Sequence, residues 1–253
     1  MRIRLGIPQT IFADLFISAF PAEFFSVTQL TNPELHSFLS DGEIDVALLP
    51  SLEIINDENI FVSKRFGIAY DGVLSDDYLY FPKNPKNINK LSLAGTVSLN
   101  EIVLSRVIFR ENYNLEVEQN VLRTIENAPD SSLIVSGDIN FANGNFSHGD
   151  SFAELIADFI DAPYLKYILA SNNKSILEFI NQNIVNMEEQ LEITSKGIMN
   201  KKGFDKTAIE FVLHNFNTLY FELTETEING YKDLRQIPYY YGLTEELKEI
   251  IFV

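Results

Sequence analysis

Blocks of apolar and polar residues follow one another along the first part of the chain, and each block has the length of one strand or helix. Residues 3–7 alternate as in a strand, residues 11–20 are mostly apolar and long enough for a helix, and residues 24–30 again indicate a strand. A helix over residues 33–40 and a strand over residues 44–49 complete the pattern. Strands that alternate with helices predict parallel β-α-β units.

The helix of residues 33–40 has clear start and stop signals. Asn32 can cap it, Pro33 suits its first turn, and Glu34 lies near its positive end. Gly42 is the expected left-handed terminator.

The strand after this helix indicates a site as well as a fold. Residues 44–49 are mostly apolar, which is typical of a parallel strand buried on both faces. In such sheets ligands bind at the carboxyl ends of the strands. Pro50 and Ser51, which end this strand, are therefore candidate ligand-binding residues.

A polar hexapeptide over residues 82–87, with two prolines and two asparagines, cannot continue a helix or a central strand. We therefore predict two lobes, the first formed by residues 1–83 and 172–253 and the second by residues 84–171. The remaining elements are predicted as strands over 60–69, 78–81, 115–119, 133–135 and 164–170, and helices over 100–111, 152–159, 175–187, 210–221, 224–231 and 244–250.

Composition narrows the class of protein. The chain has 253 residues, 46% of them hydrophobic, which is enough for a sizeable core and excludes a disordered chain. Its formal charge of -17 disfavours a nucleic-acid partner. There is no cysteine for a disulfide or a thiolate metal site, and no apolar run has the length of a membrane span or the core of a signal peptide. We expect a cytoplasmic protein.

Two polar segments at the ends of predicted elements are candidates for ligand binding. Ser98 can cap the following helix, where it and Asn100 lie beside backbone N–H groups that attract anions. Gly137 and Asp138 follow an apolar strand, and a carboxylate there can accept a ligand hydroxyl. Each segment can equally be an ordinary cap or turn.

A third polar segment carries neighbouring carboxylates. It contains Asp71, Gly72, Ser75 and Asp76, and the next residue is also an aspartate. Adjacent carboxylates can raise one another's pKa and supply an acid or a base, although such a segment can also be a solvated turn.

Common motifs for metals and nucleotides are absent from the sequence. The three histidines, His36, His148 and His214, lack the spacing of metal ligands, and no HExxH, P-loop, GxGxxG or GxSxG pattern occurs. We predict neither a metal nor a cofactor.

Taken together, several segments resemble the menaquinone-biosynthesis family that contains chorismate dehydratase. They are residues 3–6, 39–51, 67–72, 133–138, 223–231 and 241–243. The resemblance implies an α/β, two-lobed, type II periplasmic-binding-protein-like fold with parallel-rich sheets and C-terminal helices. It also implies a cofactor-free lyase that closes its lobes over chorismate and removes water to give 3-enolpyruvylbenzoate for the futalosine route.

Carried over to this chain, the resemblance assigns residues to two roles. Ser75 and Asp76 would be catalytic, with Asp76 standing where the family has a serine and Phe12 where it has an asparagine. The ligand-binding residues would be Gln9, Thr10, Pro50, Ser51, Asp71, Gly72, Ser98, Asn100, Gly137 and Asp138.

Two functions remain open at this point. One is an enzyme of the menaquinone pathway that acts on a small cyclic carboxylate. The other is a non-catalytic paralogue that binds a small anionic or aromatic metabolite. In both, the partner is a small molecule, and neither nucleic acid nor a membrane is expected; the oligomeric state is open.

Overall fold

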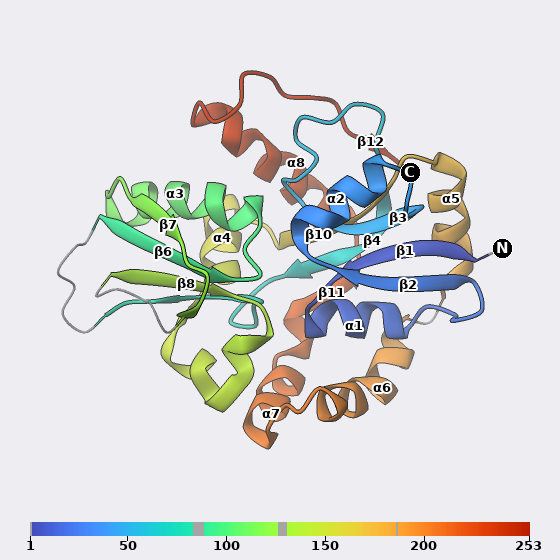
Figure 1. Ribbon diagram of the computed structural model, residues 1–253, viewed down its shortest axis with the longest axis horizontal. Coiled ribbons are helices and arrows are strands. Elements are labelled where there is room, and N and C mark those ends of the chain that lie inside the picture. Colours follow the sequence, from blue (N-terminus) through green and yellow to red (C-terminus); the bar gives the residue numbers. More distant parts are fainter. Residues whose placement is uncertain (1, 83–88, 126–130, 186) are drawn as a thin grey trace.

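Two β-sheets, each covered by helices, divide the molecule into two lobes (Figure 1). The computed structural model describes residues 2–82, 89–125, 131–185 and 187–253. We call the part built on the seven-stranded sheet the large lobe and the part built on the five-stranded sheet the small lobe. No helix in the described ranges is long and apolar enough to cross a membrane.

The large lobe contains both ends of the chain. Its strands run in the order β11-β4-β10-β3-β1-β2, and β12 adds to the β4 edge. β1 pairs in parallel with β2 and β3, whereas β10 is antiparallel to β3 and β4. The strand bounds are β1 (Ile3–Pro8), β2 (Phe25–Leu30), β3 (Val46–Pro50), β4 (Phe61–Tyr70), β10 (Tyr164–Ser171), β11 (Leu219–Glu222) and β12 (Ile251–Phe252).

The small lobe is the middle of the chain. Its strands run in the order β7-β6-β8-β5-β9, with β6 parallel to β7 and β8 and β5 antiparallel to β8 and β9. Its elements are β5 (Asp77–Tyr80), β6 (Lys90–Gly95), α3 (Leu99–Tyr113), β7 (Glu118–Val121), β8 (Ser132–Ser136), the 3-10 helix η2 (Asp138–His148), β9 (Asp150–Ser151) and α4 (Phe152–Ile160).

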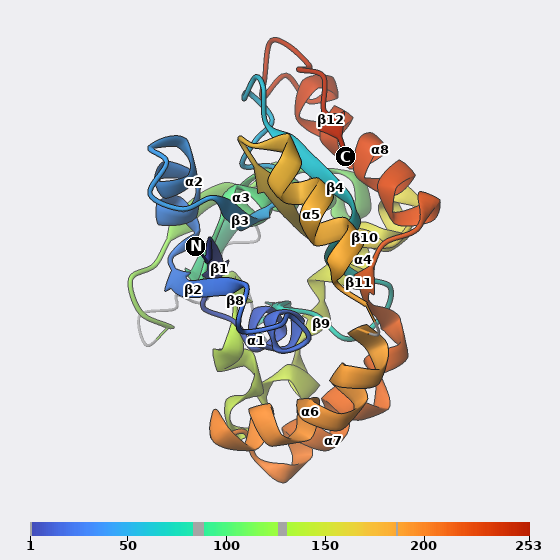
Figure 2. The ribbon, with the colours of Figure 1, turned by 90° about the vertical axis from the view of Figure 1, so that its right-hand side faces the viewer.

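The remaining helices belong to the large lobe by sequence. Two of them, α7 and α8, also contact the small lobe. α6 and α7 form a pair below α1, and α8 lies on the opposite side of the molecule (Figure 2). The bounds are α1 (Ile11–Ser18), α2 (Asn32–Ser40), α5 (Lys174–Asn183), α6 (Met187–Lys201), α7 (Lys206–His214), the 3-10 helix η3 (Phe216–Thr218) and α8 (Glu225–Tyr240).

The predicted mixed α/β architecture is confirmed, with differences in detail. The chain passes between the sheets within residues 71–76 and 161–163, so β5 lies in the small lobe and β10 in the large lobe. The predicted boundaries at 83/84 and 171/172 thus do not coincide with the crossings. The proline-rich hexapeptide lies mostly outside the described residues.

Two predictions of C-terminal helices were wrong: one helix is shorter than predicted, and the other does not form. The helix over 210–221 ends at His214, and β11 follows because the edge of β4 offers it hydrogen-bond partners. Residues 244–250 form no helix, since the segment runs extended to place β12 beside β4. The carbonyl of Lys248 accepts a hydrogen bond from Arg235 instead of one within a helix. Strand pairing with a distant segment therefore overrode the local helical pattern.

Capping explains why α2 begins and ends where it does. Its N-cap is Thr31 rather than the predicted Asn32, because Glu34 accepts hydrogen bonds from both the backbone N–H and the hydroxyl of Thr31. Gly42 follows the helix with a φ of +71°, as predicted for the terminator.

Gly95, at the end of β6, is expected to tolerate substitution less well than Gly42. Both have positive φ, which costs an alanine about 1–2 kcal/mol. A Cβ at Gly95 would also lie 2.0 Å from the carbonyl oxygen of Ser136, whereas one at Gly42 would meet nothing within 4 Å. We expect Gly95→Ala to lower the free energy of unfolding by about 3 kcal/mol or more, and Gly42→Ala by about 1 kcal/mol. Urea denaturation measures both; equal losses would contradict the close approach of these strands.

Candidate functional site

A buried lysine of the large lobe lies among carboxylates of the small lobe. Lys166 on β10 is 1% exposed, and its Nζ is 2.6 Å from Oδ2 of Asp77. The same Nζ lies 3.5 Å from Oδ2 of Asp76 and 3.5 Å from Oε1 of Glu101. These four residues, which we call the Lys166 cluster, are all buried. One positive charge is thus opposed to three acidic groups at the junction of the lobes.

The Lys166 cluster has more acceptors than donors. The hydroxyl of Tyr167 donates to Oδ2 of Asp76 at 3.1 Å, and Glu101 Oε2 accepts from the backbone N–H and hydroxyl of Ser98. Among the described residues, however, one oxygen of each of the three carboxyl groups is buried without a hydrogen-bond partner. Buried polar atoms are normally paired, so these oxygens indicate a place where a donor can be added.

Burial sets the protonation of the cluster. Loss of solvent raises the pKa of Asp76 to about 6 and that of Glu101 to about 8, in each case with a contribution from Asp77. Burial alone would lower the pKa of Lys166, but its acidic neighbours outweigh that effect and raise the pKa above its usual value. Near neutral pH, Lys166 is therefore charged, Asp76 is largely ionised and Glu101 is largely protonated.

Asn100, at the start of α3, joins the cluster to the large lobe. Its Oδ1 accepts from the backbone N–H of Leu52 at 2.9 Å. Its Nδ2 donates to the Ser51 hydroxyl, the Tyr164 hydroxyl and the Lys166 carbonyl at 3.2, 2.8 and 3.0 Å. This single amide uses both of its ends to hold the small lobe to β3 and β10.

Two helix starts at the lobe boundary each bind a carboxylate of the opposite lobe. The backbone N–H of Ile11, which opens α1 in the large lobe, donates to Asp138 of the small lobe at 2.6 Å. The backbone N–H of Leu99, which opens α3 in the small lobe, donates to Glu53 of the large lobe at 3.0 Å. Helix starts favour anions because their N–H groups are unpaired and the helix dipole is positive there. The lobes thus exchange carboxylates across their boundary.

A lysine just after α6 reinforces the first of these contacts. Lys202 Nζ lies 2.9 Å from Asp138 and 2.7 Å from Asp14 on α1. Burial raises the pKa of Asp138, although Lys202 opposes that effect. A cavity of about 380 Å³ opens beside this ion pair, lined by Asp138, Ile139, Phe141, Ala142, Lys202, Gly203, Phe204 and Asp205.

Aromatic side chains fill the space next to the first loop. Phe12, at the place where the resembled family has an asparagine, is fully buried. Its ring lies edge-on to Tyr70 of the large lobe at 5.5 Å and to Phe141 of the small lobe at 5.8 Å. A large apolar side chain therefore packs against both lobes at this point.

The structure brings together eight of the twelve residues predicted for the site. They are buried at the lobe junction or, for Asp138, half-buried at its rim: Thr10, Pro50, Ser51, Asp76, Ser98, Asn100, Gly137 and Asp138. Gln9 and Asp71 are exposed, and Gly72 is partly exposed beside Thr218. Their predicted roles in binding remain predictions.

Ser75, predicted as catalytic, is part of a turn. Its hydroxyl oxygen accepts from the backbone N–H groups of Asp77 at 3.0 Å and Ala153 at 3.3 Å. It is fully buried within the small lobe. The serine oxygen therefore supports the path of the chain into β5, and the catalytic role of Ser75 remains a prediction.

Sequence reasoning missed the centre of the site. Lys166 is a single charged residue inside an otherwise apolar strand that was predicted correctly, and a lysine in a strand buried on both faces requires a carboxylate partner. That signal was present in the sequence. Nothing local identified Asp77 or Glu101 as the neighbours of Lys166, or Glu53 as the partner of the Leu99 N–H.

No metal site is found in the described part of the chain, where no three acidic, histidine or cysteine side chains are grouped to hold an ion. His36 instead pairs with Asp57, with Nε2 at 2.6 Å from a carboxylate oxygen.

Comparison with known proteins identifies the fold. No family model matches the sequence, and a search of curated proteins finds no match. Among solved structures, protein AF1704 from Archaeoglobus fulgidus is 11% identical, with a TM-score of 0.64 over 96% of this chain and 98% of that one. The periplasmic aliphatic sulphonate-binding protein SsuA from Escherichia coli is 10% identical, with a TM-score of 0.58 over 100% and 93%.

A third similar structure is the Candida albicans CA3427 gene product, described as having the generic periplasmic binding protein structural fold. It is 13% identical, with a TM-score of 0.52 over 98% of this chain and 92% of that one. At such identities the likeness concerns the fold alone. The chain therefore has a two-lobed periplasmic-binding-protein-like fold.

Removal of the central charge is expected to be strongly destabilising. Lys166→Met leaves three buried carboxyl groups without their cation, and breaking a buried ion pair in this way costs about 3–5 kcal/mol. Lys174→Met is the matched control, because Lys174 forms only an exposed pair within α5, of a kind that contributes less than about 0.5 kcal/mol. Urea denaturation measures both; a loss below 1 kcal/mol for Lys166→Met would contradict the assigned role.

Stability is expected to fall as the pH rises through the range in which Glu101 titrates. The folded protein holds a proton up to a pKa of about 8, whereas the unfolded chain releases it near 4.5. The stabilisation is complete below pH 4.5 and is lost as the pH approaches 8, with a slope of at most about 1.4 kcal/mol per pH unit. Asp76 adds to the fall between pH 3.8 and about 6.

Glu101→Gln should flatten this profile between pH 6 and 8, since glutamine retains the capping box with Ser98 but does not ionise. The control is Glu227→Gln, which changes the equivalent capping residue of α8. Unfolding by urea at a series of pH values tests this; parallel profiles for Glu101→Gln and the parent protein would contradict it.

Proposed function

We propose that this protein binds a small molecule between its two lobes. The observation that carries the proposal is the set of buried, incompletely paired carboxyl oxygens at the junction of the lobes. A junction that never opened would gain nothing from groups that are costly to bury without partners. In a binding protein, the same groups are exposed when the lobes part and can receive a ligand.

The two helix starts favour a ligand with a carboxylate. Ile11 and Leu99 each donate a backbone N–H to a carboxylate supplied by the opposite lobe. When the lobes separate, these N–H groups are released and can bind an anionic group of similar geometry. A small cyclic carboxylate such as chorismate, which the resemblance to the menaquinone-biosynthesis family suggests, has such a group.

The charge at the centre favours binding without dehydration. Asp76 and Asp77 both lie against the single ammonium of Lys166, so a dianion held there would meet acidic groups in a site with little water. Ser75 is fully buried in a turn where its oxygen accepts from two backbone N–H groups, which disfavours it as a catalytic group. We therefore favour the non-catalytic binder, with a ligand that is aromatic or singly charged.

One observation keeps dehydration as a second candidate. Asp76 has a pKa of about 6, which is close to the value that suits a residue transferring protons at neutral pH. Its carboxyl lies beside Lys166 and the Tyr167 hydroxyl. Incubation of the protein with chorismate, followed by mass spectrometry, tests this candidate: loss of one water that Asp76→Asn abolishes would establish it.

Ligand binding is expected to compete with Asp138 for the start of α1. Thermal shift with chorismate, benzoate and 3-hydroxybenzoate should reveal a ligand that raises the melting temperature, because it binds only the folded state. Asp138→Ala removes the carboxylate that Ile11 now binds, so the affinity for that ligand should rise about 5- to 10-fold.

Asp14→Ala is the matched control for this experiment. It also removes a partner of Lys202 but leaves the Ile11 N–H contact in place. Its affinity for the ligand should stay within about twofold of the parent protein. Equal affinities for Asp138→Ala and Asp14→Ala would show that no ligand takes the place of Asp138, and no stabilisation by any of the compounds would count against the binding site.

A further inference from the structure

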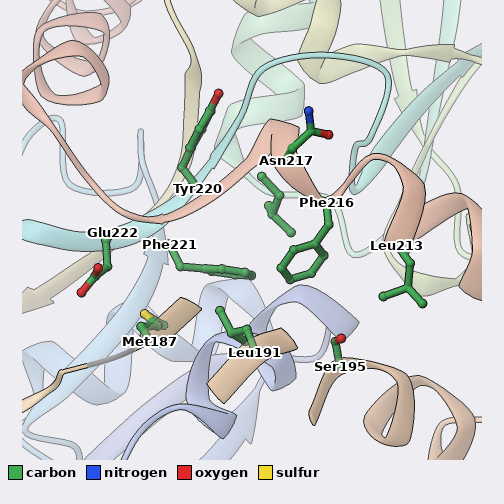
Figure 3. Close-up of a pocket in the computed structure, with 10 residues that line it drawn as sticks. Met187, Leu191, Ser195, Leu213, Phe216, Asn217, Tyr220, Phe221 and Glu222 are labelled. Atoms are coloured by element: carbon green, nitrogen blue, oxygen red, sulfur yellow. The ribbon is translucent and has the colours of Figure 1, made fainter. Parts of the chain in front are cut away.

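A second cavity lies away from the lobe junction, between the C-terminal helices and the edge of the large sheet (Figure 3). Its volume is about 530 Å³, within the range of sites that bind small molecules. It shares no residue with the Lys166 cluster or with the exchanged carboxylates. Its lining comes from α6, α7, η3 and β11 and consists of Met187, Leu191, Ser195, Leu213, Phe216, Asn217, Leu219, Tyr220, Phe221 and Glu222.

Three residues spaced one turn apart on α6 form one wall. Met187, Leu191 and Ser195 lie at intervals of four residues, which places them on the same face of the helix. The rings of Phe216 and Phe221 lie opposite them (Figure 3). Most of the lining is therefore apolar and includes two aromatic faces.

Ser195 is the polar exception on this wall. It is 1% exposed, yet its hydroxyl makes no hydrogen bond to any described residue. A serine in a helix usually satisfies its hydroxyl on the preceding turn, as the adjacent Thr194 does by donating to the carbonyl of Gln190. In Figure 3 the Ser195 hydroxyl points into the space below Phe216 and Leu213. A hydroxyl that faces an apolar cavity is suited to a ligand that carries one acceptor.

The charge around the cavity disfavours an anion. The only carboxylate among the lining residues is that of Glu222, which lies 3.0 Å from Arg65 and is neutralised there. No cation among the lining residues is available to balance an anionic ligand. The chain as a whole carries a formal charge of -17, which opposes the approach of a further negative charge.

From these observations we infer that the cavity binds a neutral, mainly apolar small molecule that has a ring to lie against Phe216 and Phe221 and an oxygen or nitrogen acceptor for Ser195. This site is separate from the proposed interlobe site and takes a ligand of different charge. Binding at one site does not require binding at the other.

The experiment measures the binding of Nile red, a neutral ring compound with a carbonyl acceptor, to the full chain by its fluorescence. We expect saturable binding to one site. Leu191→Trp on the cavity wall and Leu213→Trp at its mouth should each weaken this binding at least tenfold, because the larger side chain occupies the space. Ser195→Ala should weaken it about fivefold through loss of the donor.

The matched control is Ile193→Trp, since Ile193 lies on α6 but is 71% exposed and does not line the cavity. It should bind Nile red as the parent protein does, and thermal unfolding confirms that each variant folds. The anionic probe 1-anilinonaphthalene-8-sulfonate should bind at least tenfold more weakly than Nile red, and chorismate should not compete.

Three results would overturn the inference. The first is Nile red binding that both tryptophan variants in the cavity leave unchanged. The second is equal or tighter binding of the anionic probe. The third is a dimer in solution that Leu213→Asp dissociates, which would assign the cavity to a second copy of the chain. Failure of chorismate to bind would affect only the interlobe proposal.

Discussion

The enclosure of the Lys166 ammonium is the interaction on which the arrangement of the lobes depends. The lysine lies in a central strand of the large sheet, away from water, and its nearest carboxylate belongs to the small lobe. A buried charge without a partner is unfavourable, so the closed arrangement of the lobes requires Asp77 beside Lys166. The other acidic neighbours, Asp76 and Glu101, follow from that placement, and they give the junction its excess of acceptors.

Around this centre, hydrogen bonds join the two lobes, and a ligand can replace some of them. A carboxylate from each lobe lies at a helix start of the other, and Asn100 bridges the same boundary with its amide. Such contacts are strong only while water is excluded, since solvent competes for every N–H and oxygen once the lobes part. The N–H groups that bind carboxylates of the opposite lobe in the ligand-free protein are therefore the ones that would bind a ligand. The affinity for a ligand is then set by how much more strongly these groups bind the ligand than the carboxylates it replaces.

The segment that contains α6, α7 and α8 packs against both lobes. Phe204 and Phe211, next to or on α7, stack on Phe141 and Phe146 of η2 in the small lobe at 5.4 and 4.3 Å. On the other side, Gly230 of α8 packs closely against Ala162 at the second crossing. The C-terminal helices of the large lobe thus cover both sides of the junction. The apolar cavity beside β11 lies between that strand and the helices α6 and α7.

The sequence alone determined the features that depend on neighbours along the chain. Apolar periodicity located most helices and strands, Gly42 ended α2 as expected, and Ser98 capped α3. These features follow from the hydrogen bonds and dihedral angles of a few adjacent residues. The tertiary structure decided which distant groups meet: Asp77 reached Lys166 across 89 positions, and Asp138 reached Ile11 across 127. The same holds for β11, which lies mostly within a segment predicted as a helix, and for β12, which follows another such segment; both strands pair with the edge of β4. A local pattern has no information about such an edge, because burial and pairing are properties of the assembled sheet.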